Sequence, residues 1–398
     1  AVVDVAGGSF NAKNVEFTSL LGSANGRTLE GNVKGHNISV AAVAPDAVVL
    51  DTTVNGTVKV ANSTFDTNTN LLLDNASYVD RKAYIYDVTA GAVAVGNASA
   101  DISGTETLNS TLAGKSGITK LNSLQVKTRG ENTGKAFADA GGGGIVGYVG
   151  AHVSNTSTNR VKSTIGGKWD IAEEAYILAT QNDETRLTAS EGHGGVIGVG
   201  GTSVDNKIDT TTNTTVENNT EITANRVYVS TTNAIATGAY DDINGNGAKD
   251  VQSYTLKDHF GGVISGNRLR SLLDITEKGT VTIGQGAKIT TDNLQEYVAS
   301  SQNDLVNHAQ AKGGGAVVVT DAVTENKLNI SNTVDVQSGA LLSNEKSAST
   351  EDILLSAYDN QTLNSHSEAT VAAGVVSPLV AKNLTTMDRT SNVTIAGT

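Results

Sequence analysis

The residues with the clearest potential for chemistry lie in one acidic segment between Asp241 and Asp250. From Asp242 the segment has the pattern D-x-N-x-N-G-x-x-D, which matches the first nine positions of an EF-hand-type calcium loop. Side-chain oxygens at alternate positions, one backbone carbonyl and a glycine at the tight turn suit the oxygen coordination of calcium. The sequence therefore offers a calcium site whose ligands are Asp242, Asn244, Asn246, Ala248 and Asp250.

The same segment has a simpler interpretation as a polar corner loop. The last position of the loop holds Ser253, where a calcium loop has a bidentate glutamate, so one strong ligand is missing. Asn, Gly and Asp are also common residues of tight turns. Calcium therefore remains one of two interpretations, and it is the only cofactor that the sequence suggests.

Histidine and carboxylate side chains offer little further chemistry. His193, His259, His308 and His366 precede glycine clusters, but they do so at different distances, so a shared metal site is not expected. Asp and Glu are plentiful, yet no pair recurs at a fixed place as a glycoside hydrolase requires. The glycines of 141–150 are not followed by Gly-Lys-Ser/Thr, and no Gly-x-Ser-x-Gly motif occurs. The sequence therefore predicts that the chain is not an enzyme.

Composition excludes several classes of protein and favours one fold class. The 398 residues carry a net charge of −13 and no basic run, which disfavours nucleic acids and anionic lipids as partners. Cysteine is absent, so disulfides and thiolate metal sites are excluded. Aromatic residues make up 4% of the chain, and Val, Ile, Ala and Leu supply most of the apolar side chains. β-Branched residues favour strands and Asn, Asp and Gly favour corners, so we expect an all-β chain.

Glycine clusters give the chain an internal repeat of roughly 50 to 65 residues. Each cluster is followed directly by an apolar run such as Ile145-Val146. This spacing exceeds the usual length of one turn of a repeat architecture, so we expect two turns of about 25 residues and four to six short strands in each unit. The clusters are Gly141 to Gly144, Gly194-Gly195, Gly261-Gly262 and Gly313 to Gly315, with a weaker copy at Ala372-Ala373-Gly374.

A second marker follows the glycines, in which an asparagine precedes a basic and then an apolar residue. We expect its copies to occupy equivalent positions in successive units. The repeats are clear over residues 134–398 and degenerate over 1–133, and residues 238–258 form an inserted polar loop in the longest unit. The copies of the marker are Asn159-Arg160-Val161, Asn206-Lys207-Ile208, Asn267-Arg268-Leu269 and Asn326-Lys327-Leu328.

Repeats of this kind cannot bury their own apolar faces and must stack on their neighbours. We therefore expect a β-solenoid in the form of a single elongated rod, with a narrow interior lined by Val, Ile, Ala and Leu. Asn and Thr at equivalent positions are expected to form hydrogen-bonded ladders along the rod.

These features resemble the passenger repeats of large bacterial filamentous adhesins of the leukotoxin and filamentous-haemagglutinin type. The resemblance rests on the glycine clusters with their Val/Ile runs, on the Asn-basic-apolar step, and on the Ile-Gly-x-x-Ala-x-Ile segment from Ile283 to Ile289. It covers most of residues 134–398. It implies a right-handed parallel β-helix, exported by type V secretion as in autotransporters and displayed on the outer surface of a Gram-negative bacterium, and it brings no catalytic residues.

The function expected from this resemblance and from the composition is structural or adhesive. The chain would be an extracellular β-helical shaft or filament that mediates attachment or assembly at the bacterial cell surface. Its partners would be a receptor or glycan on a host or other cell, or further copies of the chain, with no nucleic acid and no direct membrane insertion. A β-helical polysaccharide-active enzyme and a tailspike-like protein are the alternatives.

Overall fold

The computed structural model describes residues 1–22, 29–39, 43–239, 256–345, 352–372, 375 and 377–396. Over this part of the chain the structure consists of β-strands joined by short turns, with no helix. The all-β architecture predicted from the composition is therefore confirmed. Among the described residues no helix is long and apolar enough to cross a membrane.

Most of the strands are far longer than the five or six residues that are usual in globular proteins. The short strands are β1 (Val2–Ala6), β2 (Ser9–Phe10), β3 (Asn14–Leu21), β6 (Thr64–Phe65), β11 (Leu256–Gly261), β13 (Lys288–Thr291) and β16 (Leu341–Asn344). The long strands are β4 (Leu29–Ser39), β5 (Val43–Ala61), β7 (Asn70–Ala90), β8 (Val93–Leu121), β9 (Ser123–Val216), β10 (Glu221–Gly238), β12 (Ile264–Ile283), β14 (Gln295–Gly314), β15 (Val317–Val336), β17 (Ile353–Ala372) and β18 (Leu379–Ile395).

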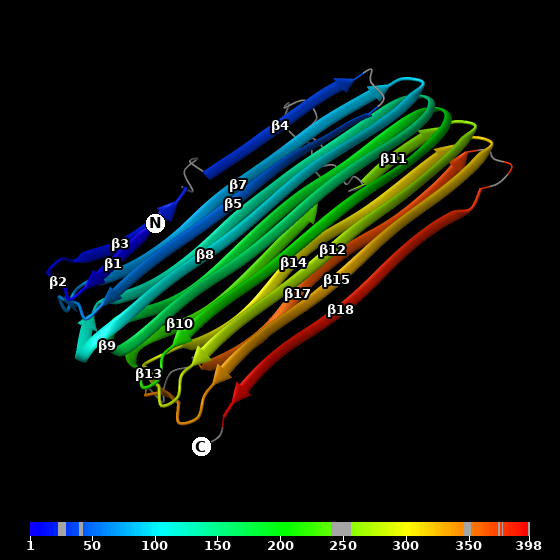
Figure 1. Ribbon diagram of the computed structural model, residues 1–398. Helices are drawn as coiled ribbons and strands as arrows, with labels where there is room; N and C mark the ends of the chain where they lie inside the picture. The colour runs from blue at the N-terminus through cyan, green and yellow to red at the C-terminus, as the bar shows by residue number, and fades with distance from the viewer. Residues whose placement is uncertain are drawn as a thin grey trace.

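The strands alternate between two layers that lie face to face (Figure 1). Within each layer the neighbouring strands are parallel. Strand β9 is very long because it continues through several corners as one strand, with irregular pairing at some of them. Layer A consists of β3, β4, β7, residues 123–143 and 174–194 of β9, β10, β11, β14 and β17. Layer B consists of β1, β5, β8, residues 146–166 and 197–216 of β9, β12, β15 and β18.

Each strand pairs with the strand one repeat further along the chain, so the register gives the repeat length. Val43 pairs with Val95, a separation of 52 residues. Within β9, the Asn155 amide donates to the Asn206 side-chain oxygen at 2.8 Å, across a separation of 51 residues. The separation rises to 67 residues where residues 240–255 intervene. One repeat therefore adds one strand to each layer.

This register corrects the expected unit of two 25-residue turns and four to six short strands. A repeat is one circuit of the chain, and it contains one strand of about twenty residues in each layer, as in β7 and β15. The inward and outward alternation of side chains continues without a break along these strands. Many Asn, Thr and Ser residues lie within these strands and not at corners. They occupy inward positions and form hydrogen bonds there, as between the Thr128 and Ser163 hydroxyls of opposite layers.

The glycine clusters form the corner where the chain crosses from layer A to layer B. The backbone N–H of Gly91 donates to the carbonyl of Gly143 at 3.1 Å, which links successive corners. A Cβ atom on Gly144 would overlap the carbonyl oxygen of Gly91, and one on Gly195 would overlap that of Gly144. Glycine is therefore required at this corner because the backbones of successive repeats stack too closely for a side chain.

The opposite corner carries an additional short strand. In three successive repeats the turn that leads into this strand contains a residue with a positive φ angle. These residues are Asn219, Gly286 and Gly339, with φ angles of 56°, 67° and 72°. Their flanking residues are register partners, so the same left-handed turn recurs in successive repeats. The short strands at this corner are β2, β6, residues 118–121, 168–171 and 221–224, β13 and β16.

The Asn-basic-apolar marker does not mark one position of the repeat, which corrects a second expectation. Asn206 and Asn326 do share a column, because both are register partners of Leu273. Asn267, in contrast, pairs with Gly200, six residues before Asn206. The recurrence of the marker along the sequence therefore reflects a common strand composition more than a common place in the fold.

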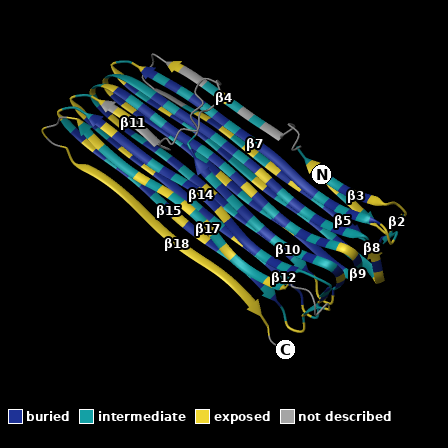
Figure 2. Cartoon of the chain, turned by 180° about the vertical axis from the view of Figure 1, so that it is seen from behind, coloured by how far each residue is buried: buried dark blue, intermediate teal, exposed yellow. Residues whose placement is uncertain are grey.

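Buried and more exposed residues alternate along the strands (Figure 2), and the buried side chains of the two layers form the core. One hydrophobic cluster fills the space beside the short strands and includes Leu73, Ile177 and Val281. A second cluster lies towards the glycine corner and includes Ile85 and Leu269. Each fully buried Val, Ile or Leu contributes about 1.5–3 kcal/mol to stability. Strand β18 differs, since its residues are exposed along its whole length.

Candidate functional site

The predicted calcium loop lies outside the described residues, between the end of β10 and the start of β11. Within the described residues no group of three or more His, Asp or Glu side chains is arranged to hold a metal ion. Calcium binding by this segment therefore stays a prediction. The ligands concerned are Asp242, Asn244, Asn246, Ala248 and Asp250.

The histidines that precede the glycine clusters do not all share one column of the repeat. His308 and His366 are register partners in β14 and β17, with ring centroids 6.0 Å apart in an edge-to-face arrangement. His193 lies on the inner face of β9, where its Nδ1 atom is 3.1 Å from the carbonyl oxygen of Gly142. The four histidines therefore do not form one continuous ladder, although His308 and His366 contact each other.

Between these two hydrophobic clusters the interior holds a strip of polar side chains, which we call the polar strip. Two smaller hydrophobic clusters, which include Ile275 and Leu108, lie beside it. Its members occupy inward positions of both layers, so the alternation along each strand places them inside. Three of them are carboxylates, Glu106 of β8, Asp183 of β9 and Glu277 of β12, and none is more than 3% exposed. The polar strip consists of Ser77, Arg81, Glu106, Asn132, Asn159, Gln181, Asp183, Thr210, Glu277 and Asn303.

Hydrogen bonds between the layers hold two of these carboxylates. Asp183 of layer A accepts from the Asn159 amide of layer B, at 2.8 and 2.9 Å, and from the Thr210 hydroxyl at 3.0 Å. Glu106 of layer B accepts from the Asn132 amide of layer A at 2.9 Å. The polar strip therefore joins the two layers by directional hydrogen bonds, which apolar side chains at the same positions could not form.

Arg81 is the cation of the polar strip, and it is 2% exposed. Glycine provides its space, because a Cβ atom on Gly104 of the opposite layer would overlap the guanidinium. Burial lowers the pKa of Arg81, and the negative charges of Asp183 and Glu106 act in the opposite direction. The remaining space beside Arg81 is about 10 Å³, which is room for one water molecule at most and for no substrate.

Burial also changes the protonation of the carboxylates. It raises the pKa of Glu106 to about 7, and a hydrogen bond from Ser77 opposes this rise. It likewise raises the pKa of Glu277 to about 7, although Glu277 accepts from the Asn303 amide at 2.7 Å. The pKa of Asp183 is raised by burial as well. The interior can therefore take up protons near neutral pH, in a region closed to larger molecules.

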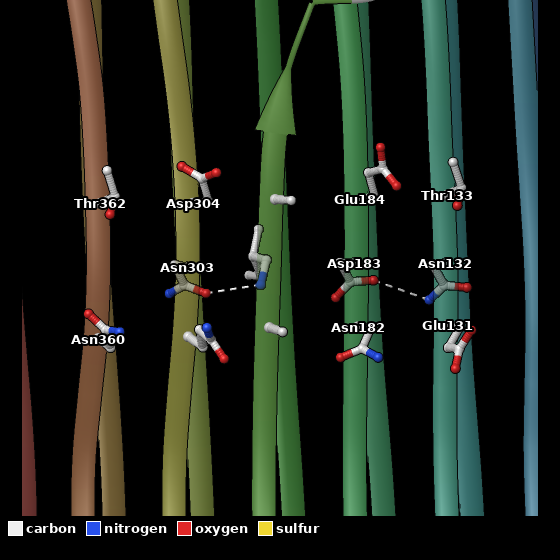
Figure 3. Close-up of a pocket in the computed structure, with 14 residues that line it drawn as sticks. Glu131, Asn132, Thr133, Asn182, Asp183, Glu184, Asn303, Asp304, Asn360 and Thr362 are labelled. Carbon is white, nitrogen blue, oxygen red and sulfur yellow. Dashed lines mark hydrogen bonds between the residues drawn. The ribbon is translucent and has the colours of Figure 1, made fainter. Parts of the chain in front are cut away.

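A groove crosses the outer face of layer A above the polar strip (Figure 3). Its volume is about 540 Å³, and none of its lining residues belongs to layer B, so it opens to the outside. Strand β10 presents only Ala234 and Ala236 outward at this place, and longer side chains stand on either side. One outward row consists of Glu131, Asn182, Ala234, Gln302 and Asn360, and the next consists of Thr133, Glu184, Ala236, Asp304 and Thr362.

The groove combines acceptors and donors of hydrogen bonds over a floor of alanine. Carboxylates come from Glu131, Glu184 and Asp304, and Glu184 accepts from Arg186 Nε at 2.6 Å. Amide groups and hydroxyl groups occupy the remaining outward positions. The described residues that line the groove include no aromatic ring and no basic side chain.

The polar strip supports the floor of the groove from below. Asn303 accepts from the backbone N–H of Ile235 at 3.0 Å, and Asn132 donates to Asp183 at 3.3 Å (Figure 3). These inward bonds join strands that each contribute to the floor. The outward side chains of the groove therefore project from strands whose backbones are hydrogen-bonded to a neighbouring strand on each side.

Sequence reasoning found neither the polar strip nor the groove. The groove residues are 51 to 68 residues apart along the chain, so only the strand register brings them together. Each of them is an ordinary residue of a polar strand. A signal for the polar strip exists in the alternation, because Glu106 and Glu277 share the inward parity of the apolar residues Leu108 and Ile275.

No known family, no curated protein and no solved structure matches this chain.

Proposed function

We propose that the chain is a right-handed parallel β-helix that forms the shaft of a secreted bacterial surface protein with a structural or adhesive role. The observation that supports this proposal best is the continuous register. Repeat after repeat places one long strand on each layer, and each strand is covered by the next. Most of the described residues lie in strands that pair with a neighbouring repeat, as expected of an elongated scaffold.

Such a shaft gains stiffness from three features of the described residues. Parallel pairing along about twenty residues joins each repeat to the next in both layers. The hydrophobic clusters extend through successive repeats, so buried contacts join neighbouring repeats from β3 to β15. Polar ladders add to this on the surface, as where Asn70 donates to Asn14 and accepts from Asn122, at 2.9 and 2.8 Å.

The adhesive part of the proposal places contact on the outer faces of the two layers. These faces offer side chains for contact because every second residue of each strand points outward. Extracellular display on a bacterial surface, a receptor or glycan as partner, and association of copies into filaments all belong to this proposal.

One observation favours a second candidate, a polysaccharide-active enzyme. Glu184 and Asp304 flank Ala236 in the groove, and their strands are two positions apart in layer A. Two strand spacings are about 9.6 Å, which is close to the separation of the two carboxyl groups in inverting glycoside hydrolases, about 6.5–9.5 Å. The lining carries no aromatic platform for a sugar ring, so the scaffold remains our first proposal.

Attachment and hydrolysis can be measured with the same preparation. Beads coated with the native chain are expected to attach to cell surfaces, and beads coated with the heat-unfolded chain are not. Attachment by neither preparation to any cell type would contradict the adhesive role. Release of reducing ends from a polysaccharide by the wild type, and its loss in Asp304→Asn, would replace the scaffold with the enzyme.

A further inference from the structure

We propose that the outer groove of layer A binds a neutral or amino-group-bearing oligosaccharide, laid across the strands and along the axis of stacking. This inference rests on the proposed adhesive function and gives it a site and a ligand class. It depends on the shape of the groove, the mixture of its hydrogen-bonding groups and its charge.

The shape suits a short extended chain. The groove crosses five neighbouring strand segments, from Glu131 to Asn360. Four strand spacings make its length about 19 Å. Ala234 and Ala236 form the floor at its middle, so the C–H face of a sugar ring can approach the backbone there. Because the strands repeat at a fixed spacing, the groove offers similar polar groups at regular intervals along a polymer.

The hydrogen-bonding groups favour a polyhydroxylated ligand. Asn182, Gln302 and Asn360 present amides, which both donate and accept, and Thr133 and Thr362 present hydroxyls. A simple cation would use acceptors alone, and a simple anion would use donors alone. Sugar hydroxyls donate and accept at each position, so they match a wall that mixes both kinds of group.

The charge of the groove narrows the class of sugar. The described residues that line it include three carboxylates and no Lys or Arg. Arg186 pairs with Glu184 from just outside the groove, while Glu131 and Asp304 form no ion pair with the described residues. Carboxylates repel uronic acids, sialic acids and sulfated sugars, and they attract a protonated amino group. A neutral or amino sugar is therefore favoured.

The floor is preorganised for binding. The inward hydrogen bonds of Asn303 and Asn132 hold neighbouring strands together directly beneath the groove. A site built on paired strands loses less conformational freedom when it binds a ligand than a site built on loops.

Three tetrasaccharides provide the probes, and they are composed of glucose, glucosamine and galacturonic acid. Titration calorimetry on the purified chain is expected to detect binding of the glucose or glucosamine probe and none of the galacturonic acid probe. Ala236→Ile fills the floor and is expected to weaken binding by about tenfold or more. Ser230→Ile is the matched control, because Ser230 faces outward on the same strand but does not line the groove.

Three results would overturn the proposal: no binding of any probe to the wild type, stronger binding of the acidic probe than of the other two, or equal binding by Ala236→Ile and Ser230→Ile. Circular dichroism of both variants establishes that each is folded. If one of these results is obtained while coated beads still attach to cells, the adhesive function is supported but its binding site lies outside the groove. If the coated beads do not attach to cells while the chain binds the sugars, the groove is a sugar-binding site and the adhesive role is contradicted.

Discussion

Replacing Glu277 by glutamine should alter how the stability of the protein depends on pH. Glu277 is 1% exposed and accepts a hydrogen bond from the Asn303 amide at 2.7 Å. Burial raises its pKa from 4.5 to about 7, and the negative charge of Asp183 adds to this. Glutamine has nearly the same size and keeps an oxygen for Asn303, but it cannot ionise. The substitution therefore removes a buried charge and preserves the packing.

The sign and size of the effect follow from proton binding. Below pH 4.5 the carboxyl is protonated in both the folded and the unfolded chain, and its contribution to stability is complete. Between pH 4.5 and 7 the unfolded chain releases the proton while the folded chain retains it, so stability falls as the pH rises. The rise of the pKa from 4.5 to about 7 corresponds to a loss of stability of about 3 kcal/mol above pH 7.

The assay is urea unfolding followed by circular dichroism at about pH 4 and about pH 8. The free-energy difference between Glu277→Gln and the wild type is expected to shift by about 3 kcal/mol in favour of the variant between these two values. Glu296→Gln is the matched control, because Glu296 points outward on β14. A difference between Glu277→Gln and the wild type that is the same at both pH values would refute the reasoning.

Further predictions concern the glycine corner, the core and the inserted loop. Gly195→Ala should lower the free energy of unfolding by about 1–3 kcal/mol, because its Cβ would overlap the carbonyl oxygen of Gly144. Gly194→Ala meets nothing within 4 Å and should cost less; equal urea midpoints for the two would contradict the stacked corner. Ile177→Ala should cost about 2–5 kcal/mol, since Ile177 is 0% exposed, and a loss below about 1 kcal/mol would argue against a packed interior. Calcium titrated into the wild type should produce heat that Asp242→Ala abolishes, and an absence of heat in the wild type would end the calcium prediction.

The sequence predicted the fold class because its signals are local. β-Branched residues and alternation are properties of single strands, and glycine clusters mark a corner that only glycine can occupy. Gly144 and Gly195 show this directly, since each would clash with the repeat before it if it carried a side chain. The repeat could therefore be detected before the strand pairing was known.

The length of one circuit could not be predicted in the same way. Thr210, Thr212 and Thr214 resemble turn or surface residues in sequence, yet all three are buried at 0% exposure in the middle of a long strand segment. Two of them donate to the facing layer, Thr210 to the Asp183 carboxylate at 3.0 Å and Thr214 to the Ser230 carbonyl at 2.8 Å. Polarity alone does not separate a corner from a hydrogen-bonded interior, so the expected turns of about 25 residues were too short.

The polar interior and the groove depend on long-range register. An interior of Val, Ile, Ala and Leu was expected, but Arg81, Glu106 and Asp183 share it, each beside groups from the facing layer or the adjacent repeat. The groove exists because Ala234 and Ala236 fall between longer side chains in the neighbouring strands. A change of register by one residue would turn all of these side chains to the opposite face.

The central claim is that successive repeats stack in register, with one strand spacing for each repeat. The chain has no cysteine, so pairs of cysteines can be introduced and spin-labelled without interference. Thr53 and Asp388 occupy one outward column of layer B, six strands apart. Pulsed electron paramagnetic resonance should give a narrow distribution near about 29 Å for this pair and near about 19 Å for Thr53 with Thr276. Broad distributions, or a distance that does not grow with the number of intervening repeats, would contradict the account.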